Sequence, residues 1–260
     1  MNTKIEIQTI IDKGFELNFG DIFNKSFENY KKIALISGLV FIVLTIIFAI
    51  LGLGVATTFY GIASFTDVMT NFKIQNFTTS AIIVYIISVV IISGLIAPIY
   101  AGLIKIADCA HQNKDFSIAT AFTYYQSAYF KPIFISSLII TLITTTISTL
   151  TQLIGYQFIG VFVVYIISFF SFLHIPFIIF GNLTAVESIL ASFNTVKQQI
   201  PVLLGLLIVS VLAICLGFFG LCIGIFFTIP FMFSLYYVIY FEIFGVNNLN
   251  EIDEIGSIEI

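Results

Sequence analysis

The chain alternates long apolar runs with short segments in which polar and apolar residues are mixed. Six of the apolar runs reach roughly the 20 residues that a helix needs to cross a hydrocarbon core of ~30 Å. They predict membrane-spanning helices at residues 33–56, 79–104, 133–154, 157–180, 202–219 and 221–244. The last two form one run broken only by glycines, among them Gly217 and Gly220. We place a turn there because one helix of roughly 40 residues would exceed a bilayer.

Three shorter segments, at 21–32, 117–130 and 184–198, carry apolar residues on one helical face only. In the third, Thr184 and Glu187 have the spacing of a capping box, and apolar residues then recur every three or four positions. Because each segment leads into an apolar run, we predict helices that lie in the plane of the membrane interface. For the third segment, the alternative is an extension of either flanking helix into water.

Each amphipathic segment precedes a pair of apolar runs, and the second run of each pair contains a proline. These prolines are Pro98, Pro176 and Pro230. We therefore predict an all-α integral membrane fold with six transmembrane helices. They form three hairpins, each preceded by a cytoplasmic-side amphipathic interfacial helix, in a pseudo-threefold internal repeat. Residues 57–78 are predicted to be an insertion in the outer loop of the first hairpin. Proline bends a helix, so the three residues either shape a pathway through the bundle or only shape helix packing.

We predict a single membrane domain with a cytoplasmic N-terminal segment at 1–19, a bundle at 20–245 and an acidic cytoplasmic tail at 246–260. The N-terminal segment lacks the apolar core of a cleavable signal, and the alternation around Ile5 allows a short strand there. Nine of the ten lysines fall on the side predicted for both termini, and only Lys73 falls on the other. Because positive residues stay in the cytoplasm, both termini are predicted to be cytoplasmic.

Composition favours a membrane protein over several other classes. Hydrophobic residues make up 59% of the 260 residues and charged residues only 9%, which is too apolar for an ordinary soluble domain. The net charge of −4 and the scattered lysines give no basic stripe, so we expect no nucleic-acid partner. Cys109, Cys215 and Cys222 have neither disulfide nor ligand spacing, and we expect no metal or cofactor.

A family resemblance rests on three parts of the chain. They are residues 19–32 (Phe-Gly-Asp-Ile-Phe-Asn-Lys-Ser-Phe-Glu-Asn-Tyr-Lys-Lys), residues 187–193 (Glu-Ser-Ile-Leu-Ala-Ser-Phe) and the glycine-rich last hairpin ending near Pro230. These parts resemble a group of uncharacterised bacterial six-span proteins. The group includes YciC-like and DUF975-like proteins and the membrane domain fused to some glycerophosphodiester phosphodiesterases. The resemblance implies the bacterial cytoplasmic (inner) membrane, and it brings no catalytic residues.

His174 is the only ionisable residue well inside a predicted span. Such a group points to a proton relay or a substrate contact, but we favour a neutral imidazole bonded to a nearby hydroxyl such as that of Ser171. Asp108, His111 and Asp115 would share one helical face and could hold a metal weakly, although we expect a solvated loop there. The candidate transport or packing positions are His174, Pro98, Pro176, Pro230 and Glu187.

Three classes of function remain open. Sparse ionisable residues and interfacial helices favour a non-enzymatic scaffold or accessory subunit of a membrane complex. The repeat, the prolines and a third span rich in threonine favour a transporter or a protein that handles lipids or small hydrophobes. An enzyme is least favoured, because no nucleophile, base and orienting group can be assembled. We predict the first class, with membrane lipids and a larger membrane protein complex as partners.

Overall fold

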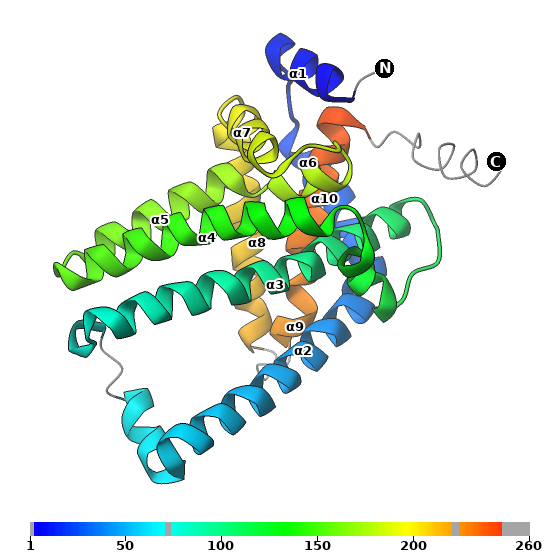
Figure 1. Cartoon of the computed structure of the whole chain (residues 1–260). Helices are drawn as coiled ribbons and strands as arrows, with labels where there is room; N and C mark the ends of the chain where they lie inside the picture. The colour runs from blue at the N-terminus through cyan, green and yellow to red at the C-terminus, as the bar shows by residue number, and fades with distance from the viewer. Residues whose placement is uncertain (1–2, 71–73, 220–223, 246–260) are drawn as a thin grey trace, which may run out of the picture.

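The computed structural model describes residues 3–70, 74–219 and 224–245, and their regular structure is entirely helical (Figure 1). The elements in chain order are α1 (Thr3–Lys13), α2 (Phe19–Thr70), η1 (Ile74–Asn76), α3 (Thr79–His111), η2 (Ile118–Gln126), α4 (Phe130–Leu153), α5 (Gln157–Ser171), α6 (His174–Ile179), α7 (Ala185–Val196), α8 (Ile200–Phe219), α9 (Gly224–Thr228) and α10 (Pro230–Phe244). The acidic tail at 246–260, Lys73 and the turn predicted near Gly220 lie outside the described residues.

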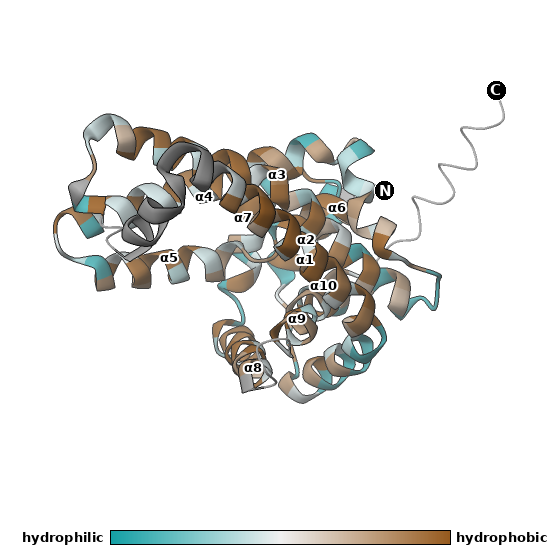
Figure 2. Cartoon of the chain, turned by 90° about the horizontal axis from the view of Figure 1, so that it is seen from below, coloured by the Kyte–Doolittle hydropathy of each residue, from teal (hydrophilic) through white to brown (hydrophobic). Residues whose placement is uncertain are grey.

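Six helical stretches are long and apolar enough to cross a membrane. They are Phe19–Gly54, Thr79–His111, Phe130–Leu153, Gln157–Ile179, Ile200–Phe218 and Gly224–Phe244. The predicted all-helical chain with six candidate spans is therefore confirmed at this level, and it is the architecture of a multi-pass membrane protein. Figure 2 shows hydrophobic residues along these helices, as expected for surfaces that face lipid.

The N-terminus forms helix α1, so the short strand predicted around Ile5 is wrong. Ile7 and Ile11 are spaced by one helical turn, and both are buried against the rest of the chain. Ile5, in contrast, is 62% exposed. The i, i+4 spacing of the two buried isoleucines thus outweighed the local alternation of polar and apolar residues.

Helix α2 runs without a break through two regions that were predicted to be separate elements. The amphipathic segment at 21–32 is the first part of this helix, whose start is capped by Asn18 Oδ1 accepting from the Asp21 amide (3.1 Å). The predicted outer loop is also helical as far as Thr70. No proline or helix-ending glycine motif separates Lys32 from the apolar run, so nothing in the sequence ends the helix there.

The spans pack as two arms. In the first arm α3 packs along α4, and α4 packs along α5; in the second arm α2 packs against α10 and α9, which lie beside α8. Figure 1 shows α3, α4 and α5 running together while α2 diverges from them. The two helices of the predicted first hairpin therefore belong to different arms, and they meet only near one end.

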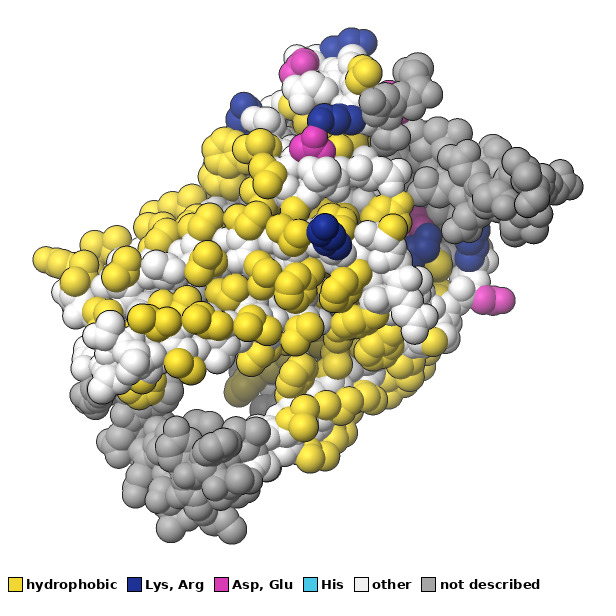
Figure 3. Space-filling model, viewed as in Figure 1, with side chains coloured by type: hydrophobic (Ala, Val, Ile, Leu, Met, Phe, Trp, Pro, Cys, Tyr) yellow, Lys and Arg dark blue, Asp and Glu magenta, His cyan; other side chains and the backbone are white. Residues whose placement is uncertain are grey.

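That end, called here the polar end, holds α1, η2 and α7 together with the last turns of α3 and α10. Figure 3 shows charged side chains gathered at its edge, while hydrophobic side chains cover the spans. The largest fully buried side chains also lie mostly here, including Tyr237, Tyr240, Leu103 and Ile33. The core of the molecule is therefore at the polar end, where the arms join.

Candidate functional site

The three candidate prolines are all buried, but they sit in different helical contexts. Pro98 lies within α3 and does not end it. Pro176 lies in the short helix α6 just after the break that follows α5, and Pro230 begins α10 just after α9 ends. Two of the three prolines therefore coincide with interruptions of a span, because proline cannot donate to the preceding turn.

The break between α5 and α6 is closed by a side chain from α7. The Ser192 hydroxyl donates to the Phe170 carbonyl (2.8 Å) and accepts from the Leu173 amide (3.2 Å). These backbone groups lose their helical partners at the break, and both would otherwise be unsatisfied within the span. Helix α7 is thus part of the span's hydrogen bonding as well as a helix packed beside it.

His174 lies at the same break. Its Nδ1 is 2.7 Å from the Ser171 carbonyl, whereas the Ser171 hydroxyl donates to the Ile167 carbonyl (2.8 Å). The predicted partner residue is therefore right, but the bond goes to its backbone oxygen and not to its hydroxyl. A carbonyl only accepts, so Nδ1 carries the proton and Nε2 the lone pair. Nε2 is buried, with no hydrogen-bond partner in the described part of the chain.

Glu187 fastens α1 to α7. Its carboxylate accepts from the Thr184 amide (3.2 Å), which confirms the predicted capping box, and it pairs with Lys4 of α1. The hydrogen bond from Lys4, followed by those at Thr184, lowers the pKa of this carboxyl below its ordinary value. Glu187 is therefore a docking residue for the N-terminal helix.

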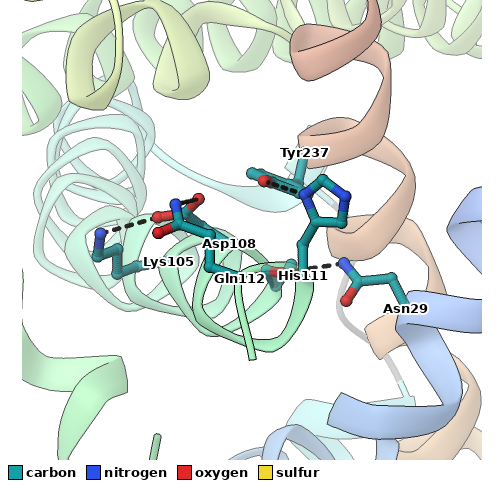
Figure 4. Close-up of polar contacts among 7 residues, drawn as sticks. Asn29, Lys105, Asp108, His111, Gln112 and Tyr237 are labelled. Atoms are coloured by element: carbon teal, nitrogen blue, oxygen red, sulfur yellow. Dashed lines mark hydrogen bonds and ion pairs between the residues drawn. The ribbon is translucent and has the colours of Figure 1, made fainter. Parts of the chain in front are cut away.

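A buried polar junction lies where α2, α3 and α10 meet (Figure 4). Helix α3 continues to His111, so Asp108 is not in a solvated loop as predicted, and it is only 1% exposed. Its carboxylate accepts from Lys105 Nζ (2.8 Å) and from Gln112 Nε2 (2.7 Å). A buried carboxylate needs such partners to offset the loss of hydration.

The junction extends from Asp108 to α10 through Tyr237. The Tyr237 hydroxyl interacts with the Asp108 carboxylate and lies 2.8 Å from His111 Nδ1. The imidazole of His111 is exposed and packs edge-on against Phe241, with ring centroids 4.6 Å apart. A hydrogen-bonded path therefore leads from an exposed imidazole to a buried carboxylate.

Helix α2 joins this junction through contacts to the backbone of α3. Asn29 Nδ2 donates to the Ala107 carbonyl (3.0 Å), and Lys32 Nζ donates to the Ala110 carbonyl (3.1 Å). Hydrogen bonds between helices are among the few specific attractions available inside a membrane. The junction can therefore fix the relative positions of three spans from both arms.

The sequence contains a helical spacing pattern that indicates this junction. Lys105, Asp108 and Gln112 follow one another at three- and four-residue spacing, which places them on one face of a continuing helix. No group of three His, Cys, Asp or Glu side chains in the described residues is arranged to hold a metal ion. The geometry at Asp108 is that of an ion pair within a hydrogen-bond network.

Comparisons with models of known protein families, with curated proteins and with solved structures find no match for the chain.

Proposed function

We propose that the chain is a non-enzymatic multi-pass protein of the bacterial cytoplasmic membrane, acting as a scaffold or accessory subunit of a membrane complex. The polar end faces the cytoplasm in this proposal. Every described lysine lies in α1, in the early turns of α2, at the end of α3, in the loop after it, at the start of α4 or at the end of α7. Lysine retained on one side of the membrane supports this orientation.

The observation that carries the proposal is the separation of the arms away from the junction. Residues 46–54 of α2 are exposed at every position, and Ile50 is 66% exposed. On α3, Ile83 and Ile87 are each 52% exposed. Two apolar helices thus diverge from a fixed joint, and the wedge between them is suited to a partner's transmembrane helix.

A glycine on α2 adds to this argument. At Gly52, no atom beyond the adjacent backbone of its own helix lies within 4 Å of the position that a Cβ would take. Small residues allow helices in a membrane to approach closely and to gain packing contacts. The unpacked half of α2 therefore offers a surface on which a second helix can pack at short range.

A position-specific cross-linking experiment in the native membrane tests the proposal. A photoreactive residue at Ile50, on the exposed half of α2, is expected to join one protein partner that also copurifies in fixed ratio in native mass spectrometry. The matched control is Phe158 of α5, which is 82% exposed and lies on the other arm. Equal labelling of lipid alone from both positions, with no stoichiometric partner, would contradict the proposal.

The predicted internal repeat remains part of the proposal. The pairs α4 with α5 and α8 with α9 and α10 each pack together, and each follows a short element at the polar end, η2 or α7. The first pair follows the same order, with the amphipathic part of α2 preceding its span. We infer one unit used three times, with its first copy opened by the packing of α2 against α10.

A second candidate function is the handling of lipids or small hydrophobes. Two largely apolar pockets flank α8, one of about 400 Å³ towards α5 and α10 and one of about 350 Å³ towards α2, and Leu212 lines both. A further pocket of about 350 Å³ is lined by hydroxyls of α4, including Thr144, Thr145 and Ser148. A defined lipid or hydrophobe that copurifies with a partner-free chain, and is lost in Leu212→Trp, would favour this class.

A further inference from the structure

A pocket of about 430 Å³ opens at the polar end, between the start of α4 and the turn that leads into α7. It is separate from the polar junction and from the wedge between the arms. Its lining residues are Ala128, Tyr129, Lys131, Pro132, Ile135, Asn182, Leu183, Thr184, Ala185 and Val186. Most of this lining is apolar. Lys131 and Asn182 supply polar side chains for contact with a ligand.

Lys131 brings a positive charge that the described part of the chain does not neutralise. It is exposed, and no carboxylate or hydrogen-bond acceptor there pairs with it. Lys4, Lys25, Lys31 and Lys105, in contrast, each pair with an Asp or Glu. The ammonium group of Lys131 is therefore available to an anion from outside the chain.

Asn182 supplies a second donor at the same pocket. Its backbone is left-handed, with φ of 52°, in the turn before α7. Its Oδ1 accepts a hydrogen bond from the Tyr129 hydroxyl, which leaves Nδ2 as the donor group of this side chain. An ammonium and an amide that share one pocket suit the oxygens of a phosphate group.

The other walls of the pocket suit a hydrocarbon chain attached to such a phosphate group. Pro132 and Ile135 line one side of the pocket, and Val186, which is 56% exposed, lines another. Leu190 and Phe193 continue the exposed apolar face of α7 beyond the pocket. A free inorganic anion gains nothing from contact with apolar walls. A phospholipid, in contrast, places its phosphate beside the start of its acyl chains.

We propose that this pocket binds the phosphate group of a phospholipid, with Lys131 and Asn182 on the phosphate and Pro132, Ile135 and Val186 against the acyl chain. The lipid would tie the start of α4 to α7 at the membrane surface. The proposal is independent of the scaffold function, since a bound structural lipid is compatible with either candidate class.

Native mass spectrometry of the purified full chain, titrated with defined lipids, tests the site. Phosphatidylglycerol is expected to bind at one site per chain, and Lys131→Gln is expected to weaken it about tenfold, since a charge-assisted bond is lost. Lys197→Gln is the matched control, because it removes the same charge at the same end of the molecule. Within the described residues, the Lys197 ammonium bonds only to the nearby Asn194 side chain. Equal weakening in both variants would overturn the proposal.

A second variant separates the apolar wall from the charge. Ala128→Phe is expected to fill the pocket and to reduce phosphatidylglycerol binding while Lys131 is intact, with thermal unfolding of each variant checking that the fold is unchanged. Diacylglycerol, which lacks the phosphate, and inorganic phosphate, which lacks the chains, are both expected to bind at least about tenfold more weakly. Diacylglycerol binding as tight as phosphatidylglycerol, or full competition by inorganic phosphate, would show that the site does not recognise a phospholipid phosphate.

Discussion

The two halves of α2 both carry apolar residues, but those residues have very different surroundings. Towards the polar end, Ile22, Ile33 and Val40 are each at most 1% exposed, and Asn29 bonds to the backbone of α3. Further along the same helix, Ile46 and Ile50 are 54% and 66% exposed. Hydropathy alone therefore identifies a membrane helix without showing which part packs against its own chain. The polar side chains mark the packed half, because interhelical hydrogen bonds hold the helices there.

A pair of glycine substitutions should show the difference most strongly. A Cβ on Gly102 of α3 would overlap the backbone of Ala121 in η2, so Gly102→Ala must push the two elements apart. We expect it to destabilise the protein by ~3 kcal/mol, as overpacking does. Gly52→Ala, in the open half of α2, should instead stabilise by up to ~1 kcal/mol through helix propensity. The free energy of unfolding in mild detergent measures both effects. Similar changes at the two positions would contradict the difference in packing between the two regions.

Removal of the junction carboxylate should be the next largest effect. Asp108→Ala leaves Lys105, Gln112 and Tyr237 without their common acceptor. We expect a loss of ~2 kcal/mol, less than for a fully buried pair because the Lys105 side chain is 37% exposed. Asp115→Asn, in the exposed loop that follows, should change the unfolding free energy by less than ~0.5 kcal/mol. Equal stability of the two variants would show that the junction does not hold the arms.

Ser192→Ala should have a smaller effect that is confined to the polar end. It removes the hydroxyl that bridges the Phe170 carbonyl and the Leu173 amide, and we expect a loss of ~1–2 kcal/mol. Ser210→Ala on α8 is the control, since its hydroxyl only donates to Leu207 of its own helix. Amide hydrogen exchange should become faster around the α5–α6 break in Ser192→Ala but not in Ser210→Ala. An unchanged exchange rate in Ser192→Ala would show that α7 does not stabilise the break.

The smallest effect expected is on the docking of α1. Because the pKa of Glu187 is lowered in the native protein, its contribution is fully present above the ordinary value of 4.5 and is lost as pH falls through the native pKa. Protection of the α1 amides, corrected for intrinsic exchange, should therefore decrease on acidification below about pH 4.5. Glu187→Gln should remove this dependence, and a wild-type response that persists in the variant would assign it to another group.

The sequence predicted the elements that depend on local pattern, and it missed those that depend on packing. Six spans follow from apolar length, and the start of α7 follows from Thr184 and Glu187. The apolar run ends before Lys105, whereas helix α3 continues to His111, with Ile106 and Ala110 on a buried face. From hydropathy alone, Lys105 marks the end of the span. In the structure, Lys105 instead forms an ion pair with Asp108 within the same helix.

The separation of the arms could not be predicted from α2 and α3 alone. Consecutive spans usually pack side by side, which favours a closed hairpin. In this protein the Ser234 hydroxyl of α10 donates to the Ser26 carbonyl (2.8 Å), and aromatic contacts join Phe23 and Tyr30 to Phe231. These contacts bind α2 to a helix some 200 residues away in the chain. Such long-range pairings carry no signature in a single sequence.

Distance measurement between spin labels in lipid nanodiscs tests the two-arm arrangement most directly. One label pair, at Lys32 and Asn113, reports the polar end, where these side chains are hydrogen bonded (3.0 Å). The other pair, at the exposed positions Ile50 and Ile91, lies on the parts of α2 and α3 away from the polar end. We predict a short, narrow distribution for the first pair and a much longer one for the second. A second distribution as short as the first, as expected for helices packed 8–10 Å apart, would contradict the arrangement and remove the wedge on which the proposed function rests.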